Sequence, residues 1–212
     1  MAVALVEEVV SLGSCDLVLL RPRDAEALID EEAFEREEFL PYWAELWPSA
    51  LALARAVAAR PLEGARVVEL GCGLALPSIA AALRGARVLA TDWSHHAVSL
   101  AAKNALRNGV SVEVALCSWT APGRILTEAP WDLILASDVL YERRNVDPLL
   151  ELLPRLVGRT GEVLLTDPGR PPAALFLERA ATGWRIETAV DPLSAVSVHR
   201  LAKPDPRPEA SA

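Results

Sequence analysis

A glycine turn that follows a short apolar segment constrains the fold of this chain more than any other feature of its sequence. The segment Val67–Leu70 has the composition of a buried strand, and the turn Gly71-Cys72-Gly73 follows it directly. A second apolar segment, Arg87–Thr91, leads to the carboxylate of Asp92, about twenty residues beyond the turn. Glycines adopt backbone angles that other residues avoid, so a ligand can approach this turn closely. The arrangement is typical of an open α/β sheet that binds a cofactor containing adenosine.

The turn differs from the dinucleotide fingerprint G-x-G-x-x-G at its last position, where Leu76 replaces the third glycine. That glycine allows close packing of strand and helix beside a pyrophosphate, so a cofactor without a pyrophosphate does not need it. Glu69, two residues before the turn, is unfavourable beside phosphates and favourable beside a cation. S-adenosylmethionine, which carries an ammonium and a sulfonium, therefore fits the turn better than NAD. The cofactor-binding residues expected from this unit are Glu69, Gly71, Cys72, Gly73 and Asp92, with Asp92 accepting hydrogen bonds from the ribose hydroxyls.

Strand patterns and helix patterns alternate along most of the chain. The expected strands of this part are Arg66–Leu70, Arg87–Thr91, Val112–Ala115, Leu133–Ser137 and Glu162–Thr166, and the expected helices are Leu46–Ala59, Pro77–Leu83, His95–Asn108 and Val146–Leu156. Ser94 suits a helix N-cap, while Gly85 and Gly109 lie where helices should stop. Repeated strand–helix units predict a doubly wound α/β fold, with a mostly parallel sheet and helices on both faces.

The two ends of the chain depart from this alternation. We expect the main domain to cover residues 41–202, an N-terminal extension to cover residues 1–40, and a proline-rich tail, residues 203–212, to be disordered. The elements expected at the ends are a strand at Leu17–Leu20, a partly ordered acidic helix within Asp24–Phe39, a helix at Ala173–Ala181, and strands at Trp184–Thr188 and Val196–Leu201 that can pair antiparallel.

Composition narrows the function classes. The chain of 212 residues has no uninterrupted apolar run of membrane-spanning length, and Glu7 and Glu8 occupy the place of a basic signal-peptide region. Three cysteines without metal or redox spacing predict free thiols in a reducing compartment, so we expect a cytoplasmic protein without a metal site. The net charge of −8 argues against a nucleic-acid-binding surface.

Several further motifs occur in a fixed order along the chain. They are Pro41-Tyr42-Trp43-Ala44-Glu45-Leu46-Trp47-Pro48, Glu69-Leu70-Gly71-Cys72-Gly73, Thr91-Asp92, Asn104, Ser118-Trp119 and Ser137-Asp138-Val139-Leu140-Tyr141. Together they resemble the class I, seven-strand S-adenosylmethionine-dependent methyltransferases, and within these the protein-lysine methyltransferases marked by a D-x-x-Y motif. The block Asp167–Pro171 is most similar to the subgroup that acts on the electron transfer flavoprotein β subunit. The resemblance implies the strand order 3-2-1-4-5-7-6.

The resemblance also implies positions for aromatic and polar side chains around the cofactor. Trp47, Trp119 and Ser137 would line the pocket, and Trp93 would cover the adenine. Each indole can instead be core packing, which is the interpretation we give Trp131 and Trp184. Ser118 is a departure, because related enzymes often have an aspartate there that binds the adenine amino group.

Asp138 and Tyr141 are the expected catalytic residues. Both follow the predicted strand Leu133–Ser137, at the sheet edge where α/β folds bind their ligands. A lysine ammonium must lose its proton before it can accept a methyl group, and a carboxylate and a phenol in an apolar pocket can orient the resulting amine. In the alternative interpretation Asp138 caps the next segment and Tyr141 packs. Arg170 could pair with Asp138 or with an acidic substrate.

The favoured function is methylation of a lysine side chain of a protein, with S-adenosylmethionine as cofactor and no metal. The N-P-P-[FY] motif of methyltransferases that act on nucleobases or glutamine does not occur after the fourth strand of the core. The alternatives are a small-molecule amine N-methyltransferase, an NAD-binding oxidoreductase and a non-catalytic protein of the same fold. The expected partner is a protein with an exposed lysine, not a nucleic acid or a membrane.

Overall fold

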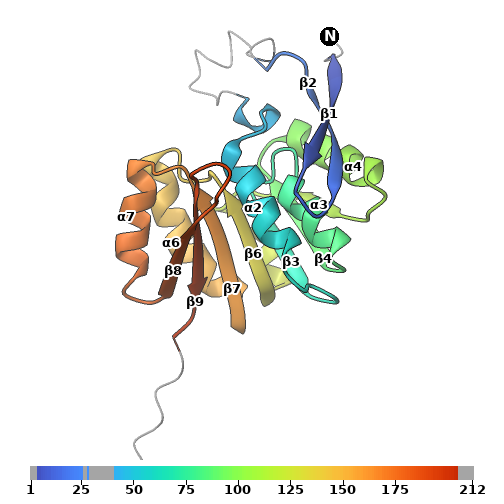
Figure 1. The fold of residues 1–212 in the computed structure, drawn as a ribbon. Helices are drawn as coiled ribbons and strands as arrows, with labels where there is room; N and C mark the ends of the chain where they lie inside the picture. The colour runs from blue at the N-terminus through green and yellow to red at the C-terminus, as the bar shows by residue number, and fades with distance from the viewer. Residues whose placement is uncertain (1–3, 26–27, 29–40, 205–212) are drawn as a thin grey trace, which may run out of the picture.

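The computed structural model describes residues 4–25, 28 and 41–204. Within these residues, seven strands form one sheet in the order β5-β4-β3-β6-β7-β9-β8 (Figure 1). The strands are β3 (Arg66–Leu70), β4 (Arg87–Asp92), β5 (Glu113–Leu116), β6 (Trp131–Ser137), β7 (Val157–Asp167), β8 (Arg185–Val190) and β9 (Ser197–Ala202). β3 to β7 are parallel, whereas β9 pairs antiparallel with both β7 and β8. This is the predicted order 3-2-1-4-5-7-6, so the predicted α/β fold class is confirmed.

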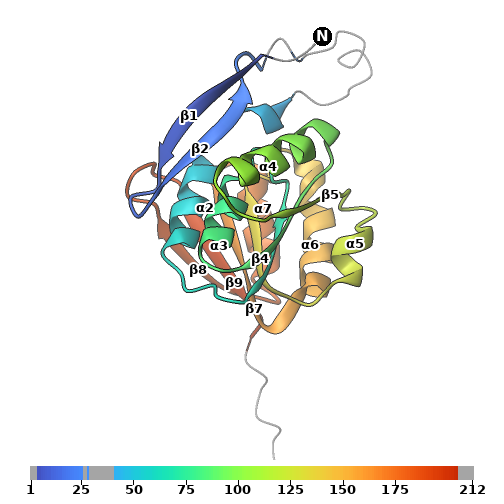
Figure 2. The same ribbon diagram turned by 90° about the vertical axis from the view of Figure 1, so that its right-hand side faces the viewer.

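Helices cover both faces of the sheet, as predicted. α2 (Pro48–Ala58), α3 (Leu76–Leu83) and α4 (His95–Arg107) lie on one face, and α5 (Gly123–Thr127), α6 (Val146–Leu156) and α7 (Pro171–Ala180) lie on the other (Figure 2). Neighbouring strand residues face opposite sides, so the sheet separates two apolar cores. Val67 and Leu133 are buried with α2 and α3, while Val68 and Ile134 are buried with α6 and α7.

A two-stranded hairpin precedes the sheet. β1 (Leu5–Ser11) pairs antiparallel with β2 (Asp16–Pro22), and both strands contribute buried apolar residues to the core around α2 and α3. The prediction of a strand at Leu17–Leu20 is confirmed, but β1 was not predicted. β1 has two adjacent glutamates in its centre, and its exposed side carries Leu5 and Val9, so its pattern lacks the usual alternation.

Other differences from the predicted elements are local. α5 lies in a stretch predicted as loop, and β7 begins five residues before the predicted Glu162. Gly158 and Gly161 interrupt the strand pattern there, and Gly161 approaches Trp131 so closely that a Cβ atom would lie 2.6 Å from the Trp131 carbonyl oxygen. The predicted helix within Asp24–Phe39 and the predicted disorder of residues 203–212 fall almost entirely outside the described residues.

None of the helices in the described residues is long and apolar enough to cross a membrane. Cys15, Cys72 and Cys117, which are all described, are free thiols, as predicted.

Candidate functional site

A cavity of about 320 Å³ opens at the carboxyl ends of β3, β4 and β6. β3 occupies the point where the strand order reverses, because the chain goes from β3 to β4 on one side and later to β6 on the other. Ligands of open α/β sheets bind at this point. Ten of the eleven predicted site residues line the cavity: Trp47, Gly71, Cys72, Gly73, Asp92, Trp93, Trp119, Ser137, Asp138 and Tyr141.

The glycine turn forms the floor of the cavity. Gly71 and Gly73 have φ angles of 68° and 49°, which lie in the left-handed region that favours glycine. A Cβ atom at Gly71 would lie 3.2 Å from Val139 Cγ1, and one at Gly73 would lie 3.2 Å from the carbonyl oxygen of Trp43. Glycine at these two positions therefore lets Val139 and the Trp43 backbone pack closely against the turn.

Asp92 lies beside the turn, at the end of β4. Its Oδ2 accepts a hydrogen bond from the Gly73 N–H at 3.0 Å, and its Oδ1 accepts one from the Ser94 N–H at 2.9 Å. A carboxylate has about four acceptor positions, so Asp92 keeps capacity for a further donor from the cavity. Burial raises the pKa of Asp92, although these backbone hydrogen bonds oppose the shift.

Glu69 is the one predicted site residue that does not line the cavity. Its side chain is fully buried below the turn, where Oε2 accepts hydrogen bonds from the N–H and hydroxyl of Ser78. Ser78 is in the first turn of α3, whose N-cap residue, Ala75, has no side-chain oxygen, so Glu69 takes over the capping role. Burial raises the pKa of Glu69 to about 8, and Oε1 has no hydrogen-bond partner among the described residues.

Aromatic side chains form the walls. The Trp47 indole donates to the carbonyl oxygen of Tyr42 at 2.8 Å, and Tyr42 in turn packs against Tyr141 with ring centroids 5.2 Å apart. Trp93 is half exposed at the rim. Trp119 lies between this cavity and an adjoining one of about 540 Å³.

The adjoining cavity shares part of its lining with the first. Gly71, Trp93, Trp119 and Tyr141 line both, and Ser118 lines only the second. The Ser118 hydroxyl lies 2.9 Å from the Thr120 hydroxyl, so it has a partner within its own loop. The two cavities together provide space for an elongated ligand that passes Trp119.

Asp138 has an unusual backbone and a paired side chain. Its φ angle is 54°, and its N–H donates to the Thr166 carbonyl oxygen of β7 at 2.9 Å. Arg170 binds the carboxylate with two nearly parallel hydrogen bonds, from Nε to Oδ1 at 2.6 Å and from Nη2 to Oδ2 at 3.1 Å. The pairing of Arg170 with Asp138, one of two options in the sequence analysis, is therefore the one that the structure shows.

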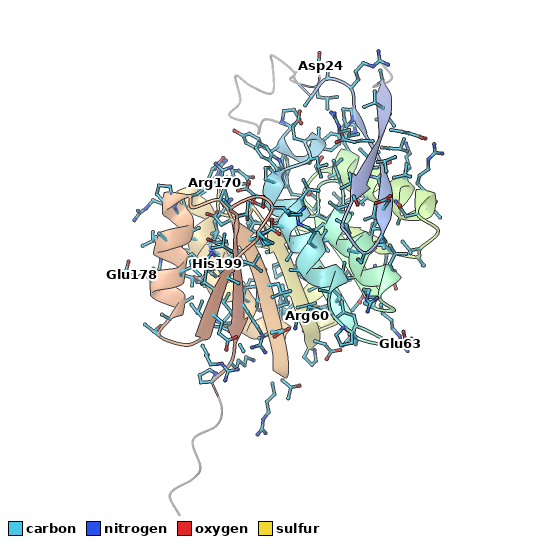
Figure 3. All side chains as sticks on the ribbon, in the orientation of Figure 1. Asp24, Arg60, Glu63, Arg170, Glu178 and His199 are labelled. Carbon is cyan, nitrogen blue, oxygen red and sulfur yellow. The ribbon has the colours of Figure 1, made fainter. Side chains whose placement is uncertain are left out.

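Asp167 fixes the segment that carries Arg170. The Oδ1 atom of Asp167 accepts hydrogen bonds from the N–H groups of Gly169 and Arg170, both at 2.6 Å. Arg170 directly precedes α7, at the end of the sheet from which that helix begins (Figure 3). In the sequence, the aspartate of the Asp167–Pro171 block, followed by proline and glycine, is the signal for this turn.

Two titratable groups in the walls are held neutral. Burial raises the pKa of the Tyr141 phenol, and the nearby carboxylates of Glu142 and Asp92 add to this effect. Burial raises the pKa of the Cys72 thiol as well, so Cys72 is a poor nucleophile. The described residues contain no group of three His, Cys, Asp or Glu side chains arranged to hold a metal ion. Trp131 and Trp184 are buried in the core, as predicted.

The arrangement combines two functions in one space. The glycine turn and Asp92 present backbone groups and a carboxylate to a polar ligand such as a ribose, and the indoles offer flat apolar surfaces. Asp138 and Tyr141 line the same cavity, at the end of β6 and in the loop that follows it. The glycine cradle, the carboxylate and the indoles fit the adenosine and methionine parts of S-adenosylmethionine.

Comparison with known families agrees with the motifs. The family model described as lysine methyltransferase matches residues 41–176, which is more than half of the chain. The electron transfer flavoprotein beta subunit lysine methyltransferase of Xenopus laevis is 36% identical over 135 residues, covering 61% of this chain and 53% of that protein. The histone-arginine methyltransferase METTL23 of Mus musculus is 35% identical over 115 residues, covering 51% of this chain and 46% of that protein. The chain thus spans about half the length of these relatives.

Solved structures share the fold at low sequence identity. A TehB-like S-adenosylmethionine-dependent methyltransferase from Corynebacterium glutamicum matches with a TM-score of 0.60 and 18% identity, over 84% of this chain and 100% of that one. The ribosomal protein L11 methylase from Lactobacillus delbrueckii matches with a TM-score of 0.56 and 22% identity, over 73% and 78%. These likenesses confirm the predicted seven-strand, Rossmann-like methyltransferase fold.

Proposed function

This chain belongs to the lysine methyltransferase family, and from that membership we propose that it uses S-adenosylmethionine to methylate a lysine side chain of another protein. One observation carries the proposal. A single cavity joins the glycine turn and Asp92, which suit the cofactor, to Asp138 and Tyr141, which suit an amine. The names of the relatives, which refer to protein lysines and arginines, support a protein acceptor.

The cofactor side of the cavity is the part between the turn and the indoles. We assign Asp92 to the ribose hydroxyls, because its carboxylate is fixed by two backbone N–H groups and faces the cavity. Gly71, Cys72 and Gly73 would lie against the methionine part, and Trp47, Trp93, Trp119 and Ser137 would enclose the rest. Glu69 would act on the cofactor through the turn and the helix start that it holds in place.

The acceptor side is the part near Asp138. When bound, S-adenosylmethionine supplies a methyl group that its sulfonium already activates. The chain therefore has to deliver an unprotonated amine in the correct direction, which is a positioning task. Asp138 would accept a hydrogen bond from the amine, and the rings of Tyr141 and Tyr42 would form the apolar walls that exclude water from it.

The test is a labelling experiment with a protein extract of the source organism. The extract is incubated with the enzyme and S-adenosylmethionine that carries a radioactive methyl group, and proteins are then separated from small molecules. We expect label in a discrete protein band. Label in the low-molecular-weight fraction alone would contradict a protein substrate and favour the small-molecule amine methyltransferase.

Calorimetry tests the cofactor separately. We expect S-adenosylhomocysteine to bind and NADH not to bind. Binding of NADH alone would favour the oxidoreductase, and binding of neither would favour a protein that has the fold without the activity. We further propose a cytoplasmic location, which the three free cysteines support.

A further inference from the structure

The charges around the cavity are mostly negative. The described charged and titratable groups that line it are Glu45, Asp92, Asp138 and Glu142, with Arg170, Tyr42, Tyr141 and Cys72. Asp167 lies close enough to act electrostatically on both Arg170 and His199. Burial lowers the pKa of His199, and the Asp167 charge opposes that shift. Among these lining residues Arg170 is the sole cation, and it is bound to Asp138 rather than to Glu45 or Glu142.

This pairing matters because of what the acceptor amine must do. A carboxylate by itself, within about 4–6 Å of an ammonium, favours the protonated amine and shifts its pKa by about 1–3 units. A protonated amine has no lone pair and cannot accept a methyl group. An unpaired Asp138 would therefore hold the substrate lysine firmly in its unreactive form.

The Arg170–Asp138 pair weakens the effect of the Asp138 charge on the pKa of the amine. Arg170 uses one acceptor position on each Asp138 oxygen, and about two remain on the carboxylate for other donors. The pair has no net charge. It can still accept an N–H hydrogen bond from an amine, but it gives little electrostatic preference for an additional proton on that amine.

We propose that Arg170 is a positioning residue that neutralises Asp138, so that the site binds the substrate lysine as the neutral amine. This inference rests on the proposed function. The proton of the incoming ammonium passes to solvent, and Asp138 retains a hydrogen bond to the amine. Asp167 contributes indirectly, since it fixes the backbone from which Arg170 reaches Asp138.

A binding experiment tests the charge preference without turnover. The probes are n-butylammonium, which has the charged end of a lysine, and n-butanol, its neutral analogue of similar size. Ligand-observed NMR at pH 7 with S-adenosylhomocysteine present compares wild type with Arg170→Gln and Arg170→Lys. We expect Arg170→Gln to bind n-butylammonium about tenfold more tightly than wild type, with n-butanol changed less than about twofold. Arg170→Lys retains the charge and should resemble wild type.

The outcomes of this experiment separate charge from shape. Equal affinity of wild type and Arg170→Gln for n-butylammonium would overturn the proposal. Weaker binding of both probes to Arg170→Gln would also overturn the proposal. That result would show that Arg170 maintains the shape of the cavity and does not set its charge preference. Arg179→Gln is the matched control, since Arg179 lies on α7, the helix that follows Arg170, and pairs with Asp147 at the surface, outside the cavity.

The rate of methyl transfer gives the second readout. We expect the pH at which the kcat of Arg170→Gln reaches half its maximum to rise by about one unit, with about a tenfold loss at neutral pH that is recovered in alkaline buffer. A uniform loss at every pH would contradict the proposal. If wild type labels no lysine but the binding preference holds, the proposed function fails, whereas the effect of Arg170 on the charge of Asp138 stands.

Discussion

At the scale of single residues, two aspartates at the same edge of the sheet have different partners. Asp92 accepts hydrogen bonds from two backbone N–H groups, which orient its carboxylate and leave capacity for a ligand. Asp138 is bound by a guanidinium, so its charge is balanced. Asp92 is therefore suited to bind a neutral diol such as the ribose hydroxyls, and Asp138 is suited to bind an amine.

The first prediction concerns Asp92→Ala. Hydrogen bonds to a charged group are worth about 1.5–3 kcal/mol, so we expect the Kd for S-adenosylhomocysteine to rise about 10- to 100-fold. The variant should remain folded, since the two freed N–H groups lie beside a cavity that water can enter. Calorimetry measures the Kd, with Asp147→Ala on the surface as control. An unchanged Kd would remove the ribose assignment.

The second prediction concerns pH and Glu69. The pKa of this carboxyl is about 8 in the folded state, raised by burial, against about 4.3 in an unfolded chain. Between these values the folded state holds the extra proton. Below about pH 4.3 the protonated group gives its full contribution to the free energy of unfolding. As the pH rises from there towards 8, this contribution falls by up to about 1.4 kcal/mol per pH unit.

Glu69→Gln removes this titration and keeps an acceptor for Ser78. Urea unfolding from pH 5 to pH 8 should therefore show the variant gaining stability relative to wild type as pH rises. Glu178→Gln, an exposed change on α7, is the control and should follow wild type. Parallel curves for Glu69→Gln and wild type would contradict the burial argument.

At the scale of elements, helix α4 connects the N-terminal hairpin to the cofactor turn. Asn104 lies on α4 and Asn108, one turn later, is the residue that caps its end. Asn104 exchanges two hydrogen bonds with the backbone of Leu20 in β2, and Asn108 exchanges two with the backbone of Val18. Asn104 is fully buried and also donates to the carbonyl oxygen of Leu74, which lines the cavity. The two asparagines therefore hold the same strand, but only Asn104 also holds the turn.

This difference gives the third prediction. Asn104→Ala and Asn108→Ala should each lower the free energy of unfolding, Asn104→Ala by about 1–3 kcal/mol because it leaves buried groups unpaired. Only Asn104→Ala should also weaken the binding of S-adenosylhomocysteine, because it frees Leu74. The measurements are urea unfolding and calorimetry. Equal cofactor affinity in the two variants would show that the hairpin and the turn are not coupled through Asn104.

The elements that the sequence predicted well are those with a strong local signal. α6 was predicted with its observed bounds, and Ser94 is the N-cap of α4, accepting a hydrogen bond from the Ala97 N–H. The elements that were missed depend on packing. α5 has only five residues, which is too short for a clear helical pattern. The residues of β1 have no clear alternation of polar and apolar side chains, and they form a strand because they pair with β2.

At the scale of the whole molecule, the strand order assembles the site. β4 and β6 lie on either side of β3, so the glycine turn, Asp92 and Asp138 meet although they are far apart in the sequence. The sequence predicted ten of the residues that line the cavity from motifs alone. It left the partner of Arg170 open, because the distance between the ends of β6 and β7 is a property of the folded sheet.

The sequence also placed Glu69 beside the cofactor, and the structure places it below the turn. Side chains along β3 point alternately to the two faces of the sheet, so the sequence indicates the face on which Glu69 lies. Only the folded structure shows which element covers that face. The neighbour of Glu69 is the start of α3, which covers it completely.

Methyl transfer to a protein lysine through Asp138 is the central claim. The most direct measurement is mass spectrometry of the labelled protein band after incubation with wild type, Asp138→Ala or the surface control Asp147→Ala. We predict methyl groups on lysine with wild type and control, and a loss of about 100-fold or more with Asp138→Ala. Methyl groups on arginine, or equal labelling by wild type and Asp138→Ala, would contradict the account.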